Sequence, residues 1–253
     1  MLNDLIQLFY QSEDFFYRAI SRECLDFEDK ASFYITGLHS EYSNPFTLRK
    51  NIPTFKKILT ECTNFAQNQN INWIVTISQY VMDKNLESTL NQMSFKLDSK
   101  TTPMFIVLNH DDDICQNNHL IINMNDNLND WITPLSEAFE SNFEQTGLYK
   151  QVRYKALNNK NNFYHFTLYD NSSPIASLTL SINNNIARID NVGTLPEYQS
   201  QGYARSIISF TLDEAKRLGA THCFLDALPE GIPLYQQIGF NPLFQNYIFK
   251  INI

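Results

Sequence analysis

One short segment of the chain combines residue types that suit phosphate binding. Residues 192–205 read Val-Gly-Thr-Leu-Pro-Glu-Tyr-Gln-Ser-Gln-Gly-Tyr-Ala-Arg, and their pattern changes from strand through turn to helix. The N-terminus of a helix has unpaired N–H groups and a partial positive charge, so it attracts a pyrophosphate. Gly202 would let phosphates approach the main chain, Ala204 would keep the first turn narrow, and Arg205 could add charge. Taken alone, one glycine before a helix is a weak signal that equally suits a plain connection.

The elements around this segment are those of a mixed α/β layer. Alternating apolar residues over 176–182 predict a half-buried strand, and the Asn-rich turn 183–185 predicts a hairpin with 186–194. The apolar period then lengthens to that of a helix over 204–218, where Gly219 suits the C-terminal cap. The other predicted elements are strands at 119–124, 163–169, 222–227 and 247–253 and helices at 131–156 and 231–238.

The N-terminal part repeats the end of this order in weaker form. Helices are predicted at 55–66 and 86–93, and strands at 71–77 and 104–108. Met93-Ser94-Phe95 ends one helix as Ile238-Gly239-Phe240 ends its C-terminal counterpart. We therefore predict a diverged internal duplication, with domains at residues 1–112 and 113–253.

Two motifs in the C-terminal half resemble those of a known family. Gln199-x-x-Gly202-x-Ala204 resembles the Gln/Arg-x-x-Gly-x-Gly/Ala signature of GCN5-related N-acetyltransferases (GNATs), and it lies between a hairpin and a helix as that family requires. Leu234-Tyr235-Gln236-Gln237-Ile238-Gly239-Phe240 resembles the family's later Leu-Tyr-x-x-x-Gly-Phe motif. The resemblance covers roughly 117–253. It implies a mixed central sheet flanked by helices, in tandem acyl-CoA N-acyltransferase folds with a degenerate first copy.

The resemblance also implies a site for acetyl-CoA as co-substrate. Tyr235 would be the general acid that protonates the departing thiolate, because a phenol with a pKa near ~10 is protonated at neutral pH. The pantetheine arm would pair with the main chain of Val192, Gly193 and Thr194. The pyrophosphate would be bound by the amides of Gln199, Ser200, Gln201, Gly202, Tyr203, Ala204 and Arg205.

The implied reaction is direct transfer of an acetyl group from acetyl-CoA to a primary amine. Its general base is open: Asp190 is the first candidate, Asp226 and Glu197 are others, and each also suits a solvated or hydrogen-bonded acid. The sequence departs from the family twice, with Leu228 where many relatives have asparagine and Thr194 at a usual valine.

The N-terminal copy lacks this machinery and is expected to line the acceptor groove. Leu90 stands where Tyr235 stands in the second copy, and no Gln/Arg-x-x-Gly-x-Gly/Ala precedes it. Its aromatic residues Trp73 and Tyr42 suit either a core or a substrate contact. Two other functions remain open for the whole chain: a non-catalytic acyl-CoA-binding sensor and a protein-interaction scaffold.

Composition restricts the partners. The 253 residues carry a net charge of −8 and no Lys/Arg-rich run, so nucleic acid is not expected. The acceptor could be a small-molecule or a peptide amine, and the chain a monomer or a homodimer. No metal is expected, and four cysteines without metal-ligand spacing suggest reduced thiols. No apolar run could span a bilayer, and no signal peptide is evident, so a cytoplasmic protein is expected; secretion without a cleaved signal remains open.

Overall fold

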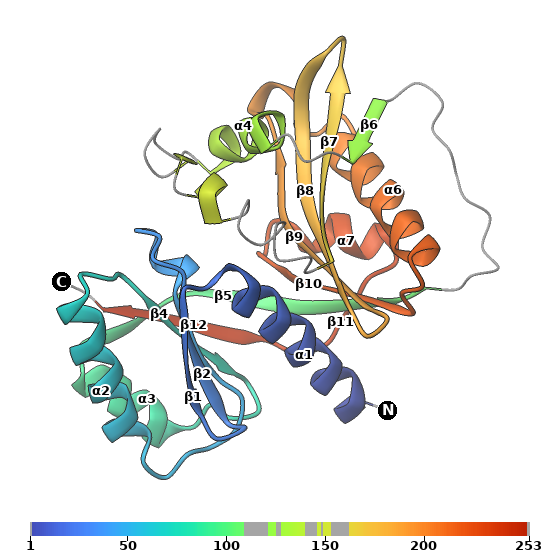
Figure 1. Cartoon of the computed structure of the whole chain (residues 1–253). Helices are drawn as coiled ribbons and strands as arrows, with labels where there is room; N and C mark the ends of the chain where they lie inside the picture. Colours follow the sequence, from blue (N-terminus) through green and yellow to red (C-terminus); the bar gives the residue numbers. More distant parts are fainter. Residues whose placement is uncertain are drawn as a thin grey trace.

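The chain folds around one long mixed β-sheet that runs through both halves of the sequence (Figure 1). The computed structural model describes residues 2–108, 121–124, 128–139, 146–147, 149–152 and 162–251. The first half comprises α1 (Leu2–Ile20), β1 (Glu23–Phe27), β2 (Ala31–Ile35), the 3-10 helix η1 (Glu41–Ser43), β3 (Pro45–Leu48), α2 (Phe55–Asn68), β4 (Ile74–Ser78), α3 (Lys84–Gln92) and β5 (Phe95–Val107).

The second half repeats a sheet with helices on both faces. Its described elements are β6 (Ile121–Met124), α4 (Leu128–Ala138), β7 (Phe163–Asp170), β8 (Ser173–Asn183), β9 (Ile186–Thr194), the 3-10 helix η2 (Pro196–Tyr198), α6 (Tyr203–Arg217), β10 (His222–Ala227), α7 (Ile232–Ile238), β11 (Asn241–Pro242) and β12 (Asn246–Ile251). The strand order is β1-β2-β3-β4-β12-β5-β10-β9-β8-β7-β6, and β11 pairs with β5.

The two halves share strands at the centre of this sheet. The last strand, β12, lies between β4 and β5 of the first half and is antiparallel to both. The long strand β5 pairs with β12 over Phe95–Thr101 and then with β10 over Thr102–Val107. The strands predicted at 104–108 and 247–253 are therefore confirmed within the described residues, as the end of β5 and as β12. The sequence did not indicate that β5 begins at Phe95 or that β12 pairs inside the first half.

The hairpin of β8 and β9 forms where the alternation predicted it. Asn184 and Asn185 adopt the left-handed backbone of a tight turn, with φ of 47° and 63°. The expectation that β8 is buried on one face only is wrong, because Ser177 and Thr179 are fully buried. The Ser177 hydroxyl donates to the Trp131 carbonyl on α4 at 2.6 Å, so α4 covers the face with the small polar residues.

A continuous helix over 131–156 is also wrong. Helix α4 ends at Ala138, and Phe139 is a turn residue whose side chain is 55% exposed. The apolar spacing continues through Phe139, but this residue belongs to none of the buried clusters that the described residues form. Helical backbone recurs at 146–147 and 149–152, while the rest of the predicted range after Phe139 lies outside the described residues.

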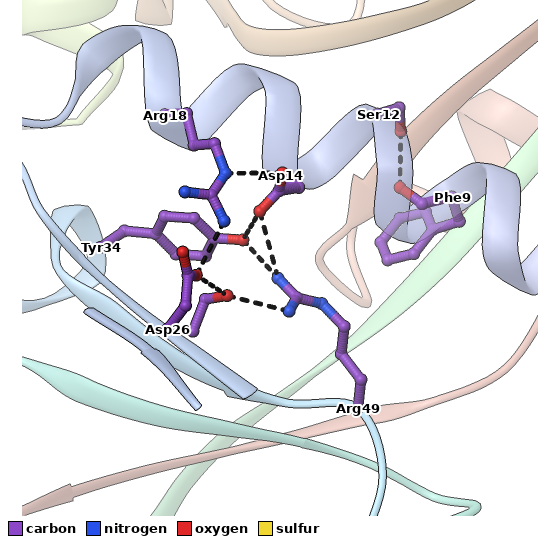
Figure 2. Close-up of polar contacts among 8 residues, drawn as sticks. Phe9, Ser12, Asp14, Arg18, Asp26, Tyr34 and Arg49 are labelled. Atoms are coloured by element: carbon purple, nitrogen blue, oxygen red, sulfur yellow. Dashed lines mark hydrogen bonds and ion pairs between the residues drawn. The ribbon is translucent and has the colours of Figure 1, made fainter. Parts of the chain in front are cut away.

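Helix α1, which the sequence pattern did not single out, packs between the halves (Figure 1). Phe9 meets Phe224 and Phe244 of the second half edge to face, with ring centroids 6.3 and 5.4 Å apart. On its other side, Asp14 accepts a hydrogen bond from the Tyr34 hydroxyl at 2.7 Å and lies 3.7 Å from the Arg49 guanidinium (Figure 2). The helix thus holds β9 and β10 against the first half.

Candidate functional site

The loop between β9 and α6 has the geometry of an anion site. Ser200 and Gly202 both have left-handed backbone, with φ of +60° and +88°. Such residues turn successive N–H groups toward one side of the chain, where an anion can bind. Gly202 is the N-cap of α6, no side chain caps this helix, and a Cβ at Gly202 would meet nothing within 4 Å. The main chain therefore has both free donors and space in front of them.

The side chains of the loop stabilise its conformation. Gln199 donates from Nε2 to the Thr194 carbonyl at 3.2 Å, and Gln201 donates from Nε2 to the Glu197 carbonyl at 2.8 Å. Arg205 donates to the Gln237 side chain on α7. These three predicted site residues thus lie at the loop and fix its shape, and the Gln199 N–H itself donates to the Pro196 carbonyl at 3.3 Å.

The strands beside the loop separate. Strand β10 pairs with β9 only from His222 to Phe224, opposite Ile186 to Arg188. Beyond Arg188, the described residues of β9 have no ladder partner on that edge, so the main chain of Val192, Gly193 and Thr194 faces a gap. The equivalent parallel strands of the first half, β3 and β4, stay paired along the whole of Pro45–Leu48.

A bulge in β9 adds to this divergence. The register with β8 shifts between Asp190, opposite Thr179, and Gly193, opposite Ser177. Asn191 within the bulge has a φ of +56°. A bulge bends and twists the strand locally and re-aims its main-chain groups. The bulge lies in the part of β9 that has no ladder partner toward β10 among the described residues.

Asp190 lies at the start of the bulge and faces a cavity. Its carboxylate accepts from Arg188 Nε at 3.1 Å on each oxygen, and its side chain is 13% exposed. Asp190 and Asn191 line a cavity of about 920 Å³ between the halves. An acid with access to a cavity can accept a proton from a bound molecule.

Tyr235 lies on α7 in a largely enclosed position. Its ring packs edge to face on Phe240 at 6.0 Å, and a Cβ on Gly231 would come within 2.9 Å of its Cε2. Burial, aided by the negative charge of Asp190, raises the pKa of the Tyr235 phenol to about 12. The phenol is therefore protonated at neutral pH and can act as a proton donor.

Comparison with known families identifies the second half. Residues 127–240 match the model of the acetyltransferase (GNAT) family. The chain contains a GNAT-family domain. A search of curated protein sequences found no significant match.

Solved structures share the whole GNAT arrangement. A GCN5-related N-acetyltransferase from Kribbella flavida superposes with a TM-score of 0.70 at 10% identity, over 93% of this chain and 92% of its own. A GCN5-related N-acetyltransferase from Sphaerobacter thermophilus has a TM-score of 0.59 at 13% identity, over 90% of this chain and 83% of its own. A tandem GNAT protein from the clavulanic acid biosynthesis pathway has a TM-score of 0.59 at 9% identity, over 87% of this chain and 78% of its own. These likenesses confirm the predicted mixed-sheet GNAT fold across both halves.

The other base candidates of the GNAT domain lie in different surroundings. Glu197 is exposed on η2. Asp226 on β10 accepts from Asn246 Nδ2 at 3.4 Å, and its other oxygen is buried. Burial raises the pKa of the Asp226 carboxyl to about 6, although the Arg188 charge acts in the opposite direction. Of the three acids, Asp190 lines the cavity.

The described cysteines are free thiols, as the sequence suggested, and the histidine on β7 is packed in the interior. His165 is buried against Trp131, with ring centroids 4.4 Å apart, and its Nδ1 lies 3.0 Å from the Thr179 hydroxyl. Cys24, Cys62 and Cys223 are free thiols, and Cys115 lies outside the described residues. No cluster that could hold a metal occurs in the part of the chain that the structure describes. Among the helices of that part, none has the length and apolarity to cross a membrane.

The sequence pattern missed a buried charged cluster beneath Asp190. Arg188 is 3% exposed and lies over the rings of Phe9 and Phe16, 5.2 and 5.8 Å from their centroids. Glu13 of α1 is equally buried, and burial raises the pKa of its carboxyl to about 7 despite the opposing charge of Arg188. The available signals were a charged residue within the apolar strand 186–189 and an acid on the apolar stripe of α1.

Proposed function

We propose that the chain transfers an acetyl group from acetyl-CoA to a primary amine. The observation that carries this is the gap between β9 and β10, which opens directly beside the left-handed loop at Ser200 and Gly202. A strand edge without a partner suits an amide-bearing pantetheine arm, and an uncapped helix N-terminus suits a pyrophosphate. The residues present thus fit both parts of the co-substrate.

The chemistry follows from the two ionisable groups near the gap. The amine nitrogen attacks the thioester carbonyl carbon, the carbon–sulfur bond breaks, and CoA leaves as a thiolate. Asp190 accepts the amine proton, directly or through water, and Tyr235 donates a proton to the thiolate sulfur. A main-chain N–H of the β9 bulge stabilises the negative charge on the carbonyl oxygen. Positioning the two reactants together supplies the rest of the acceleration.

The first half takes no co-substrate in this proposal. Its strands β3 and β4 leave no gap, and Leu90 replaces the tyrosine. Its part is to line the acceptor side, where its residues Leu38–Ser43 contribute to the cavity. Residues 1–112 and 113–253 remain the proposed division, and the cut between them lies outside the described residues.

Calorimetric titration with acetyl-CoA tests the site. Wild type should bind, and Gly202→Glu should not, because the new carboxylate would occupy the anion site and repel the pyrophosphate. Gly219→Glu is a matched control: this glycine has a φ of +87° and open space around its Cβ position, but it lies at the other end of α6. Equal loss of binding in both variants would contradict the proposed location.

Turnover distinguishes an enzyme from an acyl-CoA sensor. Release of CoA in the presence of a panel of amines should exceed release without amine. If wild type binds acetyl-CoA and no amine accelerates CoA release, the enzyme proposal fails and a sensor is favoured. If acetyl-CoA does not bind at all, a protein-interaction scaffold is favoured.

A further inference from the structure

The cavity beside Asp190 has the size of a small-molecule site. Its volume is about 920 Å³, within the range of roughly 300–1,000 Å³ usual for small-ligand pockets. Its described lining comes from α1, η1, β5, α4, β9 and β12, so both halves of the chain contribute. A folded protein could not enter such a space, whereas a compact amine could.

The charges around the cavity select against anions. The described lining residues include the carboxylates of Asp190 and Glu41 and the imidazole of His39, and neither lysine nor arginine is among them. The Lys250 ammonium lies 3.8 Å from the Glu41 carboxylate and 2.6 Å from that of Asp98, so a single positive charge is shared between two negative ones. Behind Asp190, the Arg188 guanidinium faces the acids Asp190, Glu13 and Asp226, and the Arg49 guanidinium also acts on Glu13. An ammonium is favoured here, and a carboxylate or phosphate would lose its hydration without gaining a cation.

The remaining surface of the cavity is rich in flat apolar groups. Such rings and branched side chains bind aromatic or branched bodies through contact area and ring packing. The aromatic residues are Phe16 and Tyr17 of α1, Tyr42 of η1, Phe139 directly after α4, and Tyr149. The branched residues beside them are Ile132 and Leu135 of α4 and Leu228.

We propose that the acceptor is a small primary amine on an aromatic or branched apolar body, with no carboxylate or phosphate of its own. This rests on the proposed acetyl transfer and adds the substrate class. Amino acids and amino-sugar phosphates are excluded as good acceptors, because each brings an anion into a cavity whose described lining has two carboxylates and neither lysine nor arginine.

Matched pairs of amines test the proposal. 2-Phenylethylamine differs from L-phenylalanine, and tyramine from L-tyrosine, only by the carboxylate. CoA release should give a kcat/KM for each carboxylate-free amine that exceeds its partner's by a factor on the order of 100, since juxtaposed like charges are strongly unfavourable. Comparable values within the pairs, or better turnover of the amino acids, would overturn the inference.

A charge placed on the cavity surface should reverse the preference. Ser136 of α4 lines the cavity, and its hydroxyl donates to the Thr133 carbonyl of its own helix at 3.0 Å. Ser136→Arg should lower the amine-to-amino-acid ratio about tenfold or more by pairing with the carboxylate. Ser136→Gln, of similar length without charge, should leave the ratio unchanged. An equal ratio in both variants would overturn the charge argument.

Failure of this inference differs from failure of the proposed function. If acetyl-CoA binds and amino acids or phosphorylated amino sugars are acetylated in preference to arylalkylamines, the substrate class is wrong and acetyl transfer stands. If acetyl-CoA binds and no amine of either class is acetylated, acetyl transfer itself is wrong and the substrate class falls with it.

Discussion

At the scale of single residues, the proposed turnover depends on the protonated state of Tyr235. With its pKa raised to about 12 by burial, the phenol stays protonated through the range in which most enzymes are assayed. Tyr235→Phe removes only the hydroxyl and keeps the ring contact with Phe240. We expect kcat to fall by about 10²–10⁴-fold, the usual contribution of general acid catalysis, while acetyl-CoA affinity stays within a factor of two.

A pH profile checks the same residue. Wild-type kcat should show no loss from phenol ionisation up to pH 10, two units below the raised pKa. Tyr164→Phe, at a half-buried tyrosine packed on the same core, is the control and should leave kcat unchanged. An alkaline fall centred near pH 9 that disappears in Tyr235→Phe would contradict the raised pKa.

Glu13 gives a prediction about stability. Its carboxyl has a pKa of about 7 in the folded chain against 4.5 ordinarily, because burial disfavours its charged form. Between these values the folded state binds more protons than the unfolded state, so this group's contribution to stability is lost as pH rises from about 4.5 to 7. Glu13→Gln should therefore be more stable than wild type at pH 8, by up to roughly 2–3 kcal/mol, and similar to it near pH 4.5.

Urea unfolding at the two pH values measures this difference. Glu61→Gln serves as the control, because Glu61 is exposed on α2 and only 3.9 Å from Lys57. It should show the same small effect at both pH values. If Glu13→Gln is destabilised most at pH 8, Glu13 is ionised and paired in the folded chain, and the raised pKa is wrong.

At the scale of elements, the contact between α4 and β9 holds the diverging strand in place. A Cβ on Gly193 would lie 2.7 Å from Leu135 Cδ2 and 3.3 Å from its Cα. Gly193→Ala should therefore push α4 away and cost about 1–3 kcal/mol of stability, as overpacking does. Adding Leu135→Ala to it should cost less than the sum of the two single changes, because the space made by one is filled by the other.

Thermal unfolding of the four variants completes that cycle. Gly147→Ala is the reference for the glycine change alone, since it adds a Cβ that meets no atom within 4 Å at a backbone outside the left-handed region. Strict additivity of the two changes at Gly193 and Leu135 would show that the helix does not press on the strand.

At the scale of the whole molecule, the shared strands make the halves interdependent. Without residues 113–253, β4 and β5 lose β12 from between them; without residues 1–112, β10 loses β5. Unpaired edges of this kind expose main-chain groups and apolar faces. We expect each fragment alone to be unfolded or aggregated by circular dichroism and gel filtration, and the two to form a folded complex when co-expressed.

Cleavage of the intact chain provides the control. A protease site introduced within 109–120, between β5 and β6, should leave the cut protein folded and binding acetyl-CoA, because both sets of strands remain. A fragment 113–253 that folds cooperatively and binds acetyl-CoA by itself would contradict the interdependence.

The sequence determined those parts that depend on neighbouring residues. Period 2 followed by period 3.6 located β7 to β10 and α6, and glycine and asparagine marked the turns, because these signals follow from backbone sterics and local hydrogen bonding. The loop from Gln199 to Arg205 and Tyr235 on α7 were instead singled out by the resemblance of two short motifs to those of the GNAT family. Their surroundings agree with those assignments, while their roles stay predictions.

Only the tertiary structure decided which distant segments meet. Nothing local in Asn246–Ile251 indicates a position between β4 and β5, since any buried strand would carry the same alternation. The burial of Glu13 and Arg188 together, and the contribution of Leu38–Ser43 to the cavity beside Asp190, depend on α1 packing between the halves. Contacts between residues far apart in sequence are selected by the packing of whole surfaces, and no short stretch of sequence contains that information.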